Sequence, residues 1–234
     1  MEKDSKEIDT GRVFSHSVQV LKERPSIVVP FLGANLISSI IYLLTVALFM
    51  DSPLPQRGLP RGQIFIAFVI GIALQSMAFG MSTLMAWNHV KGIPDDLWQS
   101  LRATIAQAFQ LITAGLLLGT ATAVGIFFFV LPGLFLAFFF MFTFFFIMVK
   151  RQHIFEAMKE SFVLVNRNFL QSLKLFLLIV ALSILVAFTG VVLMRASLVG
   201  QFLNALVVSV LFGLTATMLV VFYKIWEEFT FFRN

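Results

Sequence analysis

The chain alternates between long stretches without charged residues and short polar segments that carry its charge. Six stretches contain no Asp, Glu, Lys or Arg. A helix needs about 20 apolar residues to cross the hydrocarbon core of a bilayer, and five of the six stretches reach that range. The shortest, 134–149, reaches it when Pro132-Gly133 is counted as its start. The pattern predicts six transmembrane helices over 26–50, 64–86, 109–130, 134–149, 175–193 and 198–222.

The apolar run from 109 to 149 is interrupted only by Leu131-Pro132-Gly133. Both flanks of the run are basic, so both are expected on the same side of the membrane, which requires two crossings. Proline favours the start of a helix and glycine the position beyond its end, so Pro132 and Gly133 are predicted to form the hairpin turn.

Lysine and arginine are distributed very unevenly between the connections. With the N-terminus in the cytoplasm, 14 basic residues fall on the cytoplasmic side, and only Arg57, Arg61 and Arg195 fall outside. Cytoplasmic loops carry an excess of such residues. The sequence therefore predicts a multi-pass protein of the prokaryotic cytoplasmic (inner) membrane with both termini in the cytoplasm. The polar tail 1–11 lacks the features of a cleaved signal peptide.

Three cytoplasmic segments have apolar residues at helical spacing. Each is predicted to be a short amphipathic helix that lies in the membrane interface ahead of a hairpin. The fold expected is therefore all-α, with six transmembrane helices in three hairpins and a single polytopic membrane domain over 1–234. Its three units cover approximately 12–88, 94–149 and 152–226. The stripes are Val13, Phe14, Val18 and Leu21; Trp98, Leu101, Ile105 and Ala108; and Phe155, Met158, Phe162 and Val165.

Composition narrows the class of protein further. Hydrophobic residues make up 59% of the chain and charged residues 12%, far from the average of a soluble domain. The net charge of +5 is concentrated beside apolar segments. It indicates contact with anionic lipid headgroups at the cytoplasmic face rather than with nucleic acid. The absence of cysteine excludes thiol catalysis and thiolate metal sites.

Two parts of the sequence form a recognisable pattern. One is Leu131-Pro132-Gly133 followed by an apolar stretch and by Glu156-Ala-Met-Lys-Glu-Ser161-Phe-Val-Leu-Val-Asn-Arg167-Asn168; the other runs from Phe14 to Pro25. The chain resembles the membrane domain at the N-terminus of some glycerophosphoryl diester phosphodiesterases, and related stand-alone prokaryotic membrane proteins. The resemblance marks Glu156, Ser161, Arg167 and Asn168 as motif positions. It implies no catalysis, because the phosphodiesterase barrel is absent.

Candidate catalytic groups are few. His16, His89 and His153 each lie near one interfacial segment and could converge on a metal, but no pair has helical ligand spacing. The adjacent carboxylates Asp95-Asp96 and Glu227-Glu228 are interpreted as solvated segment ends. We therefore expect no enzyme, no cofactor and no metal site.

No ionisable residue lies inside a predicted span, which argues against ion-coupled transport. Uncharged polar residues do occur there, and they either hydrogen-bond between helices or line a path for a neutral substrate. The residues singled out for this role are Asn35, Gln75, Thr120, Thr143 and Asn204.

Gly115 and Gly119 form a small-xxx-small motif that allows two helices to approach closely, either within this chain or with a partner or second copy. The phenylalanine-rich segment after the hairpin turn is interpreted as a lipid-contact surface that includes Phe138, Phe139, Phe142 and Phe145. Two functions remain open. The first is a non-catalytic membrane scaffold or accessory subunit, and the alternative is a protein that handles a lipid or a neutral solute.

Overall fold

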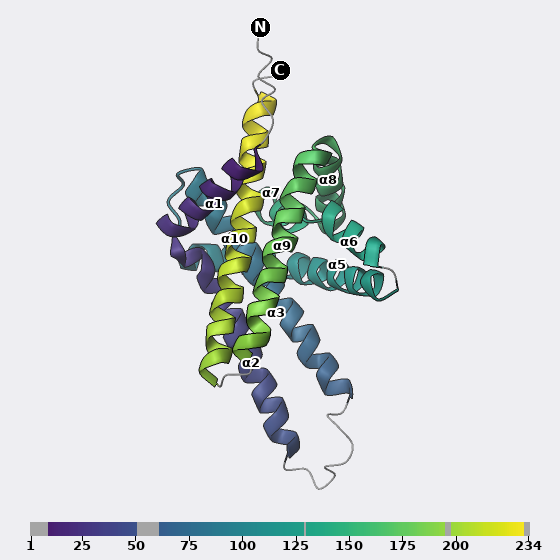
Figure 1. The fold of residues 1–234 in the computed structure, drawn as a ribbon. Coiled ribbons are helices and arrows are strands. Elements are labelled where there is room, and N and C mark those ends of the chain that lie inside the picture. The colour runs from purple at the N-terminus through teal and green to yellow at the C-terminus, as the bar shows by residue number, and fades with distance from the viewer. Residues whose placement is uncertain (1–8, 51–60, 129, 195–197, 232–234) are drawn as a thin grey trace.

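The computed structural model describes residues 9–50, 61–128, 130–194 and 198–231, and every regular element in these ranges is helical (Figure 1). A short 3₁₀ helix, η1, precedes α2. The helices are α1 (Thr10–Glu23), η1 (Pro25–Val28), α2 (Val29–Met50), α3 (Arg61–Val90), α4 (Leu97–Ala106), α5 (Ala108–Phe128), α6 (Val130–Phe139), α7 (Thr143–Lys150), α8 (Ile154–Arg167), α9 (Phe169–Met194) and α10 (Leu198–Phe231).

Five helical segments of the described chain are long and apolar enough to cross a membrane. A sixth is counted if α1 and the start of α2 are taken together, although they are bent by 97° at their junction. This confirms an all-helical, multi-pass class of protein with five to six candidate spans. The five segments are Phe65–Val90, Ala108–Phe128, Val130–Lys150, Phe169–Leu193 and Val199–Thr230.

The core lies around α10, α3 and α7. Helix α10 packs against α1, α2, α3 and α9, and α7 packs between α3 and α8. Large side chains from these helices, among them Met85, Phe142, Phe146 and Phe222, are fully or almost fully buried in one cluster. In Figure 1, α9 and α10 run alongside each other, while α5 and α6 extend to the side of them.

The structure corrects the lipid contact expected for Phe138, Phe139, Phe142 and Phe145. All four side chains are at most 6% exposed, because α7 and the end of α6 pack into the core. The ring of Phe145 lies 4.4 Å from that of Tyr223, and the ring of Phe139 stacks on that of Phe162 at 4.8 Å. Exposed phenylalanines lie elsewhere, and the most exposed of those in α5, α6 and α8 are Phe109, Phe127, Phe128, Phe135 and Phe155.

The position of the hairpin turn is also corrected. Pro132 and Gly133 belong to the first turn of α6, and α5 already ends at Phe128. Proline is tolerated there because the first backbone N–H groups of a helix have no intrahelical partner. A Cβ atom on Gly133 would lie 2.5 Å from the backbone nitrogen of Ile126, so glycine is needed for the close approach of α5 and α6.

Ser161 of α8 joins the two halves of the broken α6–α7 segment. Its hydroxyl accepts a hydrogen bond from the backbone N–H of Phe142 at 3.1 Å and donates one to the carbonyl of Phe139 at 2.8 Å. The helical hydrogen bonds are interrupted between Phe139 and Thr143, so this buried serine supplies partners that the helix itself does not.

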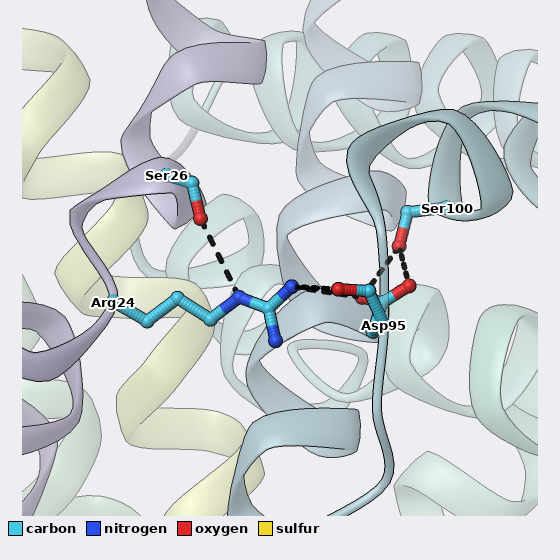
Figure 2. A network of polar contacts seen from close by, with 4 residues as sticks. All are labelled: Arg24, Ser26, Asp95 and Ser100. Carbon is cyan, nitrogen blue, oxygen red and sulfur yellow. Dashed lines mark hydrogen bonds and ion pairs between the residues drawn. The ribbon is translucent and has the colours of Figure 1, made fainter.

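The corner between α1 and α2 is held by Arg24 (Figure 2). Its guanidinium donates to the backbone carbonyl of Asp95 at 2.5 Å and lies 3.7 Å from the Asp95 carboxylate. The Ser100 hydroxyl contacts both carboxylate oxygens at 2.7 and 2.8 Å. These contacts connect the junction of α1 and η1 to the segment between α3 and α4.

Helix α4 directs its polar side towards the protein. Ser100 and Thr104 are buried, whereas Trp98 is 65% exposed and Ile105 is exposed. On α8 the buried side comprises Ile154, Ala157, Ser161, Leu164 and Val165, which leaves Phe155 and Phe162 of the expected apolar stripe exposed. The apolar side chains of these helices are thus divided between the protein core and its outer surface.

Candidate intramembrane polar site

Three helices meet at a hydrogen-bonded group of uncharged polar side chains. Gln75 of α3 donates its amide N–H to Asn35 Oδ1 of α2 at 2.6 Å, and Asn35 donates to Ser209 Oγ of α10 at 2.8 Å. The Ser209 hydroxyl in turn donates to the carbonyl of Ala205 at 2.7 Å. Hydrogen bonds of this kind hold helices together where water is absent.

The three side chains lie near the centres of their charge-free stretches. Gln75 is the central residue of 64–86, Ser209 is next to the centre of 198–222, and Asn35 is three residues from the centre of 26–50. Three residues of helix correspond to about 5 Å along the axis. If these stretches span the bilayer, the polar group lies close to its midplane.

A cavity of about 600 Å³ lies beside this group, between α2 and α10. Its wall combines polar and apolar side chains, and the described lining residues carry no charge. The lining residues are Asn35, Ser38, Ser39 and Leu43 of α2 and Gln201, Asn204, Ala205 and Val208 of α10. Leu43 is 56% exposed, and Ser39 and Gln201 are exposed as well, so the cavity opens on the outer surface of the two helices.

Several buried polar atoms around the cavity have no hydrogen-bond partner among the described residues. They include Ser38 Oγ, Asn204 Oδ1 and Gln75 Oε1. Leaving a buried polar atom unpaired costs about 1–3 kcal/mol, so such atoms are rare in native structures and call for an explanation. The side chain of Asn204 lies against Gly190 of α9, where a Cβ atom would come within 2.8 Å of Asn204 Oδ1.

A second, apolar groove of about 420 Å³ lies on the other side of Gln75, between α3, α5 and α7. Gly115 and Gly119 both line it. Gly115 is buried against Ser76 of α3, so this glycine packs within the chain, while a Cβ atom on Gly119 would have only one neighbour within 4 Å, the Ile72 side chain at 3.9 Å.

The structure brings together three of the five polar residues singled out in the sequence, Asn35, Gln75 and Asn204. Thr120 is exposed, and Thr143 is buried in the core of α7. Sequence reasoning missed Ser38, Ser39, Gln201 and Ser209. The available signal was the placement of all four within charge-free stretches, where every uncharged polar side chain is a candidate.

The histidines and carboxylates have separate surroundings. His89 contacts Glu23 at 3.1 Å, His153 contacts Gln110 at 3.1 Å, and His16 is exposed on α1. Glu227 pairs with Lys91 at 2.6 Å. Within the described ranges, no three His, Asp or Glu residues lie close enough together to hold a metal ion.

The motif positions all belong to α8 or its end. Glu156 lies in the first turn and Arg167 in the last, both exposed. Asn168 caps the C-terminus, and its amide donates to the carbonyl of Leu164 at 3.0 Å. Among these described motif positions, Ser161 is thus the one whose hydrogen bonds connect α8 to the α6–α7 segment.

The chain was compared with family models, curated proteins and solved structures. No family model, no curated protein and no solved structure matches it. The resemblance to the membrane domain of glycerophosphoryl diester phosphodiesterases therefore stays a prediction. The polar cavity and its hydrogen-bonded group are what the chain itself offers as a basis for function.

Proposed function

We propose that the protein binds and moves an uncharged molecule, a lipid or a neutral solute, within the membrane. The observation that carries this proposal is the cavity of about 600 Å³ between α2 and α10, which five uncharged polar side chains line and which lies next to buried polar atoms without partners among the described residues. A ligand that bonds these atoms would remove the cost of leaving them unpaired.

The chemistry of the wall favours a neutral ligand. Amide and hydroxyl groups both donate and accept hydrogen bonds, but they do not compensate a charge. A charge brought to this depth without a partner is costly. The described residues that line the cavity include no Lys, Arg, Asp or Glu.

We expect purified protein in phospholipid vesicles to accelerate the movement of a fluorescent lipid or of glycerol across the bilayer. The Asn204→Leu variant should be about tenfold slower, the effect of losing an interaction of roughly 1.4 kcal/mol. Lipid movement is measured by dithionite quenching and glycerol entry by stopped-flow light scattering. Thr215→Val is the matched control, because Thr215 lies on the same helix, outside the cavity lining, and bonds only its own backbone at Leu211. Folded protein that accelerates neither would contradict the proposal.

We also propose six spans in three hairpins, with both termini and the helices α1, α4 and α8 on the cytoplasmic side of a prokaryotic inner membrane. Contacts between helix ends support this arrangement. Lys91, after α3, pairs with Glu227 of α10, and Lys150, at the end of α7, lies over the Tyr223 ring of α10 at 5.5 Å. The C-terminal ends of α3, α7 and α10 thus lie on one side, as the second, fourth and sixth spans of the proposed topology require.

The exposed side chains Trp98 and Ile105 suit an α4 that lies in the membrane interface, and the basic residues suit contact with anionic headgroups.

The lack of native cysteine makes this topology directly testable. We expect Arg57→Cys, in the part of the chain outside the described residues, to react with a membrane-impermeant maleimide in intact cells. Gln99→Cys, exposed on α4, should react only after the membrane is opened. The proposed orientation would be overturned if both cysteines reacted equally in intact cells, or if only Gln99→Cys reacted there.

A non-catalytic scaffold or accessory subunit is the second proposal. Gly119, which lines an open apolar groove, is the observation that favours it, because Gly115 is already occupied by contacts within the chain. A partner helix or a second copy would need this groove. Loss of a co-purifying protein upon substitution of Gly119 is the test of this function.

A further inference from the structure

We infer that the ligand of the cavity between α2 and α10 is a lipid that carries a free hydroxyl and no charge, and that it enters sideways from the bilayer. This inference rests on the proposed function and names the class of molecule that the site takes.

The way into the cavity indicates a lipid rather than a solute from water. The exposed residues at its mouth, Ser39, Leu43 and Gln201, lie on two apolar helices beside exposed Leu36 and Phe202. Apolar side chains that surround an opening at this depth face hydrocarbon if the helices span the membrane. A molecule dissolved in the bilayer can therefore enter this mouth directly from the side.

The extent of the cavity matches part of one leaflet. Its α10 residues run from Gln201, in the first turn, to Val208, close to the centre of 198–222. Seven residues of helix cover about 10 Å, within the ~15 Å of hydrocarbon in one leaflet. This leaflet is the one opposite Lys224, which lies at the other end of α10 and bonds the carbonyl of Val90. A headgroup at Gln201 and Asn204 would keep its acyl chains in hydrocarbon.

The unpaired polar groups beside the cavity favour a ligand that carries a hydroxyl group. Ser38 Oγ and Asn204 Oδ1 are buried without partners among the described residues, and the terminal torsion of asparagine is soft enough to turn either its oxygen or its nitrogen to a ligand. A hydroxyl both donates and accepts, so one such group satisfies either orientation. A phosphate would bring a charge that no described lining residue balances.

The test uses the full-length protein in phosphatidylethanolamine–phosphatidylglycerol vesicles with two photoreactive lipids of identical acyl chains. One is a diacylglycerol, and the other is the corresponding phosphatidic acid, in which a charged phosphate replaces the free hydroxyl. We expect diacylglycerol to label peptides of α2 and α10 at least about tenfold more strongly, as a difference of ~1.4 kcal/mol gives. Competition by unlabelled diacylglycerol or by a long-chain isoprenoid alcohol then shows which source of the hydroxyl is preferred.

Asn204→Leu should lower this labelling severalfold, and Thr215→Val should leave it unchanged. Gln201→Leu, at the exposed mouth, gives a second test if Asn204→Leu does not fold. Equal labelling by both lipids, or labelling that ignores both substitutions, would overturn the inference. Specific labelling by phosphatidic acid alone would overturn both this inference and the uncharged ligand of the proposed function, whereas no lipid labelling together with glycerol movement that Asn204→Leu slows would overturn the lipid alone. No labelling together with no lipid or glycerol movement would overturn both the inference and the proposed function.

Discussion

Replacing Gly115 with isoleucine is expected to destabilise the protein severely, whereas the same substitution at Gly119 is expected to be tolerated. A Cβ atom on Gly115 would overlap Ser76 Oγ and lie 2.9 Å from Ser76 Cβ on the facing helix. Ser76 cannot move away easily, because its hydroxyl is bonded to the carbonyl of Ile72 at 2.7 Å and its side chain is buried. The nearest atom to a Cβ on Gly119 would be 3.9 Å away, an ordinary contact.

Overpacking costs about 1–3 kcal/mol in a well-packed core, and a clash between two helices belongs at or above the upper end. For a chain of this size, ~3 kcal/mol lowers the melting temperature by about 6–12 °C. Thermal unfolding of the two variants in one detergent, followed by size-exclusion chromatography, measures the difference. Equal stability of the two variants would show that α3 and α5 do not pack as described.

The same pair of variants tests the scaffold proposal. Under the scaffold hypothesis, both glycines would belong to one partner face, and isoleucine at both would leave the fold intact. The structure separates them, because Gly115 faces α3 and Gly119 faces the groove. Loss of a bound protein from a stable Gly119→Ile variant would support a partner in the groove, and an unchanged complex would count against it.

The contrast between these glycines shows what the sequence can and cannot predict. Charge-free stretches locate the long helices well, because the cost of burying charge in hydrocarbon is large and local. They do not show which side of a helix faces lipid, because lipid and protein core are equally apolar. Phe142 and Phe145 were therefore predicted to contact lipid, although they lie in the core.

For the candidate site, too, the sequence indicates which residues are involved but not how they are arranged. Asn35, Gln75 and Asn204 could be selected from the sequence, because polar residues in apolar stretches are few and each needs a partner. Their pairing depends on how α2, α3 and α10 are rotated and at what depth each lies, and neither quantity is encoded in a single helix. The Arg24–Asp95 contact escaped prediction for a similar reason, since 71 positions separate its two residues.

Replacing Arg24 with methionine is expected to lower the stability of the protein by about 2–4 kcal/mol. Removing one partner of a buried ion pair costs about 3–5 kcal/mol, because the remaining charge is left without compensation. The Asp95 side chain is only 2% exposed, while that of Arg24 is 20% exposed, and this access to solvent reduces the expected loss. Methionine keeps the aliphatic stem but removes every hydrogen bond that Figure 2 shows for Arg24.

A second substitution tests whether the uncompensated charge of Asp95 causes this loss of stability. Combining Arg24→Met with Asp95→Asn removes the unpaired charge, so the double variant should be more stable than Arg24→Met alone. Arg12→Met, on the exposed side of α1, controls for the loss of one positive charge and should change the melting temperature little. If the two substitutions instead destabilise additively, Asp95 is not stabilised by Arg24. The corner between α1 and α2 must then be held by the packing of Val20 and Ile27, both of which are buried in the core.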